Sequence, residues 1–265
     1  MRKKINLVLS GGGARGIAHL GVIKALQESG YSIQRISGVS SGAIIGAFIA
    51  KRMTPDEILD IAISTKGFSV TRPPFSLGLF NKKNMVEVLS RYFAGTQFED
   101  LEIPLTVSAT NINTCNTDYF KSGDLLMSLV ASSALPLLFA PVHLNGYQYV
   151  DGGFVNNLPV EPFLDDPLPR IGVSVNLVKE EQELTSTFRI LERAIQISVS
   201  KNAEQRKKYL DLIIEPEKLS DYKAYDFHKP KEIFNAGYEH AKNILSTFPR
   251  VPEKKPRLFR RKYAA

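Results

Sequence analysis

The chain has 265 residues, of which 43% are hydrophobic and 23% charged, a composition that indicates a folded protein and excludes a largely disordered one. Its length suits one large α/β domain or two small ones. The formal net charge is +7, but residues 250–265 hold seven Lys or Arg against one Glu, so the rest is nearly neutral. We therefore expect no nucleic-acid partner, since such a domain needs a basic face on its folded part.

Cysteine content and hydropathy bear on the compartment. Cys115 is the only cysteine, which excludes an intrachain disulfide and a metal cluster of cysteines. The basic start is followed by an apolar run that ends at Leu9, too short for a secretory signal, and no run has the 18 or so apolar residues of a membrane span. We expect a cytoplasmic protein.

Strands alternate with helices along the chain. Short apolar runs predict buried strands, and apolar residues spaced by three and four predict helices. Strands are expected at 5–9, 32–39, 105–109, 117–121, 171–178 and 210–215, with a hairpin at 142–150. Helices are expected at 17–29, 43–50, 54–65, 83–93, 125–134, 186–208 and 230–247, with a short helix after Pro159. This alternation predicts an α/β fold, with helices on both faces of a sheet.

Two segments stand apart from this pattern. Residues 67–80 contain two prolines, two glycines and three phenylalanines without a period, so they form an apolar loop that either packs as core or acts as a lid or acyl-contact surface. We see no linker or repeat before residue 249, so one domain at 1–249 and a basic, flexible tail at 250–265 is the simplest organisation. The tail either adheres to anionic membranes or is a solvated end.

The sequence Gly38-Val39-Ser40-Ser41-Gly42 predicts a serine on a sharp turn between a strand and an apolar helix. Flanking glycines relieve crowding on such a turn and push the hydroxyl outward, which makes Ser40 a candidate nucleophile. Ser41 is expected to cap the helix. Ser174 imitates the pattern but lies inside an expected strand.

The glycine loop, residues 11–16, follows the first strand and fits a dinucleotide-binding fingerprint. That fingerprint needs an acidic residue at the end of the second strand, and this strand ends Ser37-Gly38-Val39 without one. The sequence therefore lacks the acidic residue that a dinucleotide-binding site requires, and we do not expect such a site here. The alternative is a set of backbone N–H donors for an oxyanion, with Arg15 adding positive charge or pairing with a core acid.

A nucleophilic serine needs a base, and none of the four histidines is a clear candidate. His228 and His240 lie in a polar, helical region without a glycine or turn signature, and His19 lies on the helix after the glycine loop, where packing or solvent exposure explains it. Asp151 has such a signature, because it follows a hairpin strand and precedes Gly152 and Gly153, so its backbone can approach another loop closely.

Together these motifs resemble those of the patatin-like phospholipases, in particular the small bacterial type. The glycine loop, the serine turn, the Ala-Ser-Ser-Ala-Leu-Pro sequence at 131–136 and Asp151-Gly152-Gly153 occur in that family's order. One departure is Ser10, where many relatives have an acid, and we expect it to affect loop packing more than chemistry. The resemblance implies a three-layer α/β/α fold with a mainly parallel sheet, and its implied site residues are the catalytic Ser40 and Asp151, an oxyanion hole at Gly11, Gly12, Gly13 and Ala14, and the supporting Arg15, Gly16, Gly38, Gly42, Gly152 and Gly153.

The resemblance also implies a serine lipid acyl hydrolase acting on phospholipids, lysophospholipids or related lipids, with no metal or organic cofactor. Its expected partners are the lipid substrate and, through the basic tail and the 67–80 loop, a membrane surface; an oligomer is left open. The alternative is a non-catalytic lipid-binding or regulatory protein on the same fold.

Overall fold

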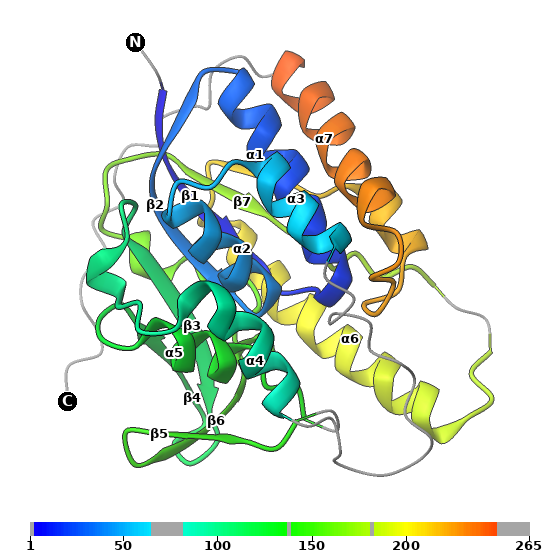
Figure 1. The fold of residues 1–265 in the computed structure, drawn as a ribbon. Coiled ribbons are helices and arrows are strands. Elements are labelled where there is room, and N and C mark those ends of the chain that lie inside the picture. Colours follow the sequence, from blue (N-terminus) through cyan, green and yellow to red (C-terminus); the bar gives the residue numbers. More distant parts are fainter. Residues whose placement is uncertain (1–2, 65–81, 137–138, 181–182, 248–265) are drawn as a thin grey trace.

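The computed structural model describes residues 3–64, 82–136, 139–180 and 183–247 (Figure 1). An eight-stranded sheet runs through it in the order β5-β6-β3-β2-β1-β7-β8, with β4 paired to β3. Its strands are β1 (Lys3–Leu9), β2 (Tyr31–Val39), β3 (Leu105–Asn111), β4 (Asn116–Phe120), β5 (Val142–Leu144), β6 (Tyr147–Asp151), β7 (Arg170–Val173) and β8 (Leu212–Ile214).

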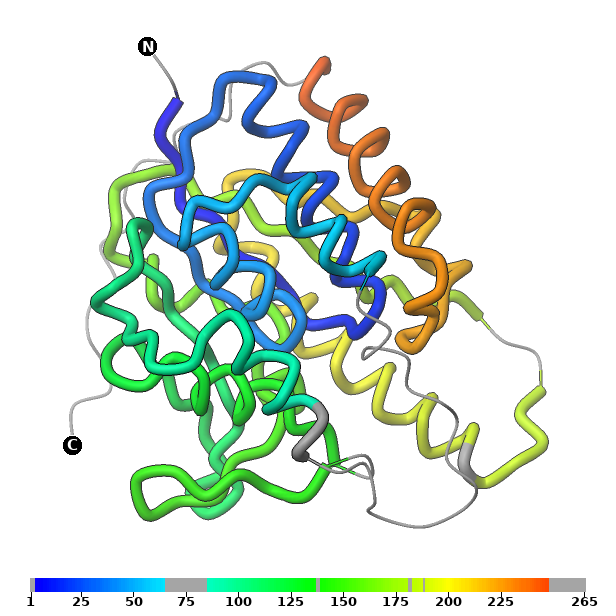
Figure 2. Tube along the Cα trace, in the orientation of Figure 1, coloured from blue at the N-terminus to red at the C-terminus, as the bar shows by residue number. Residues whose placement is uncertain are grey.

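Five of these strands, β3, β2, β1, β7 and β8, pair in parallel, and β4, β5 and β6 add to them antiparallel. The blue N-terminal strands therefore lie between the green segment that carries β3 to β6 and the later β7 and β8 (Figure 2). A mainly parallel sheet is thus confirmed, as is the hairpin predicted at Asn145-Gly146, where both residues adopt positive φ.

Helices surround the sheet (Figure 1). The α-helices are α1 (Ala18–Glu28), α2 (Ser41–Ala50), α3 (Pro55–Ser64), α4 (Lys82–Phe93), α5 (Leu125–Ser132), α6 (Thr187–Lys207) and α7 (Pro230–Thr247). Short 3-10 helices are η1 (Gly13–Ile17), η3 (Phe98–Asp100), η4 (Gly152–Phe154), η5 (Glu161–Phe163) and η6 (Glu217–Asp221).

The alternation of side chains along β1 produces two cores. Leu7 and Leu9 point into the main core, which they share with α1 to α5 and α7. Val8 points to the opposite face, into a smaller core with Phe163 of η5 and Ala203 of α6. The expected three-layer α/β/α fold is confirmed, with one thick and one thin helical layer.

Helices α1 and α7 pack with their backbones almost in contact. A Cβ atom added at Gly21 would lie 2.1 Å from the carbonyl oxygen of Phe234, and one at Gly237 would lie 2.3 Å from that of Ala18. Only glycine fits at either position, so the C-terminal helix is fixed tightly beside the first one.

Two expected strands are shorter than predicted. β8 covers Leu212–Ile214 rather than 210–215, and β7 ends at Val173 rather than at residue 178. After Ser174 the chain leaves the sheet to contact the glycine loop, where the N–H of Val175 donates to Ser10 Oγ at 3.1 Å. Apolar character alone did not reveal this change of partner.

The segments 67–80 and 250–265, with their predicted lid and membrane contacts, lie outside the described residues. The single-domain organisation stays a prediction. Among the helices of the described residues, none has both the length and the apolar character of a membrane span.

We expect Gly237→Ala to destabilise the protein by ~1–3 kcal/mol, because the new methyl group would overlap the Ala18 carbonyl. Helix propensity alone predicts the opposite sign, a gain of about 1 kcal/mol for alanine over glycine. Urea denaturation monitored by circular dichroism measures the difference. Asn235→Ala, exposed on the same helix, is the matched control. An unchanged or raised stability of Gly237→Ala would contradict the close packing.

Candidate active site

The sheet register brings the two candidate catalytic residues to the same level. Along one edge of β3, Val39 of β2 lies opposite Ser108, so Ser40 comes next to Ala109 as the chain leaves the sheet. Asp151, at the end of β6, lies opposite Ala109 on the same edge, because β4 pairs along the other edge. Ser40 and Asp151 therefore meet beside one strand, although 110 residues separate them in sequence.

Ser40 occupies a strained corner between β2 and α2. Its φ of 52° and ψ of −127° are unusual for a residue with a Cβ atom. The flanking glycines make room for the turn. A Cβ added to Gly38 would lie 2.8 Å from the backbone nitrogen of Ala43, and one added to Gly42 would lie 2.5 Å from the carbonyl oxygen of Ser10. The geometry is that of a nucleophile elbow.

The segment at 131–136, which we call the anchor segment, holds the backbones of both residues. The N–H of Ser40 donates to Ser132 Oγ at 2.7 Å, and that hydroxyl donates to the Ser108 carbonyl, also at 2.7 Å. The N–H of Asp151 donates to the Ala134 carbonyl at 3.0 Å. One short segment thus positions the strained turn and the carboxylate together.

The Asp151 side chain is buried, with 8% of its surface exposed. Its carboxylate accepts a hydrogen bond at 2.8 Å from the N–H of Gly153 and lies beside the Ser40 hydroxyl. Burial raises the pKa of Asp151 to about 6 and outweighs the interactions with Ser40 and with the N–H of Gly153, which lower it. The carboxylate is therefore a stronger base than an ordinary aspartate and is still mostly ionised at neutral pH.

The glycine loop packs directly against Ser40. A Cβ added at Gly11 would lie 3.0 Å from that of Ser40. Within the loop, the N–H of Gly11 donates to Asn157 Oδ1 at 3.1 Å and the N–H of Ala14 donates to the Ala224 carbonyl at 2.7 Å.

No other described residue accepts from the N–H groups of Gly12 and Gly13. Of the four residues expected to form an oxyanion hole, Gly12 and Gly13 are therefore the two whose N–H groups have no acceptor among the described residues.

Arg15 is linked to the glycine loop by hydrogen bonds through Asn176. The buried guanidinium donates from Nη2 to Asn176 Oδ1 at 2.7 Å, and the Asn176 amide donates to the Gly11 carbonyl. Burial lowers the pKa of Arg15 to about 10, while the charges of Glu192 and Asp226 oppose this shift. The arginine stays protonated at neutral pH, and its hydrogen-bonded partner is an amide rather than the core acid that the sequence left open.

Ser41 and His19 both lie close to the glycine loop. Ser41 does not cap α2, because Ser40 is the N-cap residue and the buried Ser41 hydroxyl has no hydrogen-bond partner among the described residues. His19 is fully buried, and its Nε2 is 2.8 Å from the Ser10 carbonyl oxygen. Burial lowers the pKa of His19 to about 4, so this neutral ring holds the start of the glycine loop.

Ser132, Asn157 and Asn176 were not singled out in the sequence. Ser132 lies in a segment that carried a family motif, which was a usable signal for importance but not for its role. The two asparagines had no local signal, because their partners in the glycine loop are 146 and 165 residues away.

An apolar pocket of about 70 Å³ opens beside the glycine loop, between α2 and α3. Gly13 and Ser41 form its end nearest the loop, and its walls include Ile44, Phe48, Ile58 and Phe227. Such a lining suits a hydrocarbon chain and offers almost no hydrogen bonds.

Comparison with known proteins gives a family match. The model of the family described as patatin-like phospholipase matches residues 7–164, a range that contains the glycine loop, the serine turn, the anchor segment and Asp151.

Curated relatives cover most of this chain. Lysophospholipase nte1 of Neurospora crassa is 29% identical over 92% of the chain, and an uncharacterised NTE family protein of Mycobacterium bovis is 34% identical over 60% of it. The chain spans only 18% of the Neurospora protein and 45% of the Mycobacterium protein.

Among solved structures, VipD from Legionella pneumophila aligns with a TM-score of 0.53 and 16% identity, over 93% of this chain and 67% of that one. This likeness supports the fold.

We expect Asp151→Asn to stabilise the folded protein by ~1–3 kcal/mol at pH 7–8. The folded-state pKa of about 6 exceeds the ordinary value of 3.8, so the folded protein binds more protons between these values. So far as Asp151 contributes, the wild type therefore has its full free energy of unfolding below pH 4, where Asp151 is neutral, and loses part of it as the pH rises through 6 and Asp151 ionises.

Urea titrations from pH 4 to 8 test this, and the gap between variant and wild type should shrink towards pH 4. Asp60→Asn, exposed on α3, is the matched control and should change the free energy of unfolding by less than about 0.5 kcal/mol. A gap of equal size at every pH would rule out a raised pKa of Asp151.

Proposed function

Because the chain belongs to the patatin-like phospholipase family, we propose that it is a serine lipid acyl hydrolase that works through a Ser40–Asp151 dyad. The membership confirms the resemblance seen in the motifs, and ester hydrolase is the class that it indicates. The observation that carries the proposal is the placement of a strained, elbow-like serine beside a buried carboxylate at the edge of one strand.

In the acylation step, Ser40 Oγ attacks the carbonyl carbon of the lipid ester while its proton moves to the Asp151 carboxylate. The tetrahedral intermediate then collapses, the bond to the alcohol breaks, and protonated Asp151 returns the proton to the leaving oxygen. An acyl ester on Ser40 remains.

Negative charge on the carbonyl oxygen needs preorganised donors. The N–H groups of Gly12 and Gly13 are suited to this because they are unused among the described residues and belong to the loop that packs on Ser40. Removal of one such donor typically lowers the rate about 100- to 1000-fold. Asn157, Asn176 and Ala224 act as positioning residues for these donors.

Deacylation reverses the roles. Asp151 takes a proton from water, whose oxygen attacks the acyl carbonyl, and the proton returns to Ser40 as the fatty acid leaves. No step passes through a metal or an organic cofactor.

The apolar pocket supports a fatty acyl substrate, since it begins at Gly13 and Ser41 beside the proposed reaction centre. Phospholipids, lysophospholipids and related acyl esters all fit this assignment, and the name of the Neurospora relative favours lysophospholipids.

We expect Ser40→Ala and Asp151→Asn each to lower kcat/KM for lysophospholipid by about 10⁴-fold or more, because each removes one member of a unit that works jointly. Ser174→Ala is the matched control, because Ser174 is also a buried serine and its sequence, Gly172-Val173-Ser174, imitates that around Ser40.

A fluorophosphonate probe should label wild type and Ser174→Ala but not Ser40→Ala. Full activity of Ser40→Ala would end the dyad proposal, and an unlabelled wild type without activity would favour a lipid-binding protein.

The pH profile of kcat/KM should rise tenfold per pH unit up to about pH 6 and then level off, because the base must be ionised in the free enzyme. A stopped assay with a lysophospholipid from pH 4 to 8 measures it. An acid limb near pH 4 would mean that Asp151 has an ordinary pKa during the reaction.

A further inference from the structure

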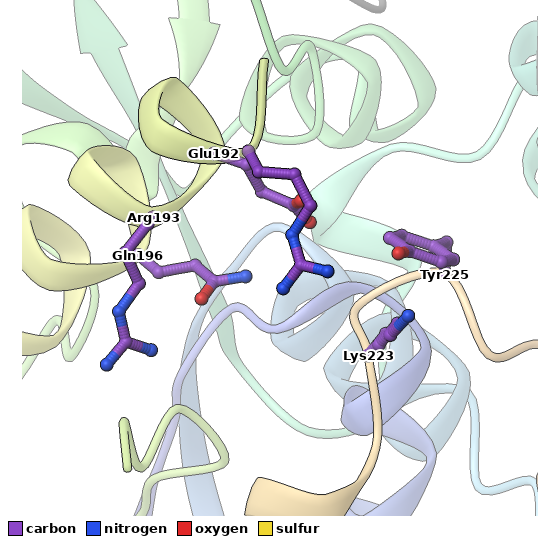
Figure 3. A pocket seen from close by; sticks show the side chains of 6 residues that line it. Glu192, Arg193, Gln196, Lys223 and Tyr225 are labelled. Carbon is purple, nitrogen blue, oxygen red and sulfur yellow. The ribbon is translucent and has the colours of Figure 1, made fainter. Parts of the chain in front are cut away.

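A second pocket, of about 50 Å³, lies between the first half of α6 and the loop after η6 (Figure 3). We call it the basic pocket. It is lined by Arg189, Glu192, Arg193 and Gln196 of α6 and by Lys223 and Tyr225 of the loop. Its volume exceeds the 10–15 Å³ that one water molecule needs, so the pocket has room for more than a single water.

The charge of this lining is positive, with three cations against one carboxylate. The carboxylate, Glu192, also interacts with the charge of the buried Arg15, so a further cation lies close by. The Lys223 ammonium stands over the Tyr225 ring, 5.7 Å from its centre, and the Arg193 guanidinium is anchored on the Lys179 carbonyl. Arginine and lysine side chains that line one small pocket are the residue types that bind a phosphate group.

The loop at 223–227 joins this pocket to the proposed reaction centre. Between Lys223 and Tyr225 lies Ala224, whose carbonyl accepts the N–H of Ala14 and whose oxygen would be 2.3 Å from a Cβ added at Gly13. Further along the loop, Phe227 lines the apolar pocket. The loop at 223–227 thus borders the basic pocket, the glycine loop and the apolar pocket.

We infer that the basic pocket binds the phosphate of the substrate's head group while the acyl chain occupies the apolar pocket. This inference rests on the proposed function. In a glycerophospholipid, a glycerol unit separates the ester carbonyl from the phosphate. Here Gly13 lines the apolar pocket, and Ala224, which lies against Gly13, is flanked in sequence by two residues of the basic pocket. Phosphate binding at this position makes the enzyme select phospholipid esters over neutral esters with the same acyl chain.

The test compares two substrates with one acyl chain, a short-chain lysophosphatidylcholine and the matching monoacylglycerol, both below their micellar concentrations. For Arg189→Gln/Arg193→Gln, and separately for Lys223→Gln, kcat/KM for the phosphate ester should fall about 10- to 100-fold, as expected for the loss of charge-assisted hydrogen bonds. Hydrolysis of the monoacylglycerol should change less than about threefold. Arg52→Gln/Arg91→Gln is the control, because it removes two arginines of exposed ion pairs that do not line the pocket.

Equal loss on both substrates, or no loss on either, would overturn the inference. A wild type that hydrolyses neither substrate would refute the proposed function instead, and the pocket is then tested by binding. Titration calorimetry of lysophosphatidylcholine into Ser40→Ala should give a Kd that rises about tenfold or more when Arg189 and Arg193 are replaced.

A third arm separates a head group from a free ion. Inorganic phosphate should inhibit hydrolysis of the lysophospholipid competitively in wild type and less in the double variant. If inorganic phosphate binds in a way that needs the two arginines while the two substrates are affected equally, the pocket holds free phosphate and the head-group assignment is wrong.

Discussion

The pairing of the Ser40 hydroxyl with the buried Asp151 carboxylate is the interaction on which the rest of the site depends. A carboxylate becomes a useful base for a hydroxyl only if its environment raises its pKa, and burial does so here. Burial in turn demands hydrogen-bond donors for the carboxylate oxygens, and the N–H of Gly153 is one of them. The glycines on both turns are needed because the backbones must approach more closely than a Cβ atom allows.

These requirements work against stability, and the surrounding fold offsets them. A strained φ at Ser40 and an ionised buried group at neutral pH each raise the free energy of the folded state. The two cores on opposite faces of the sheet and the tight α1–α7 contact provide stabilisation away from the site. The protein therefore separates a rigid scaffold from a site that would be more stable if it were neutral and relaxed.

Local signals in the sequence were enough for most of the fold and for the candidate dyad. Hydrophobic periodicity, the positions of glycines and the presence of turn-forming residues are patterns over a few neighbouring residues. They correctly predicted the elbow at Ser40, the hairpin before Asp151 and the span of α7. The partners of the glycine loop escaped because they are set by tertiary packing: Asn157, Asn176 and Ala224 come from three loops that the sheet order brings together. For the same reason β7 was predicted too long.

The anchor segment determines how the site responds to motion. It holds the N–H of Ser40 through Ser132 and the N–H of Asp151 through Ala134, two attachment points only two residues apart. A displacement of the end of α5 would therefore carry both groups in the same direction. The glycine loop is tied elsewhere, to Asn176 and Ala224, so such a displacement would change the distance from Ser40 to the N–H groups of Gly12 and Gly13 more than the distance from Ser40 to Asp151.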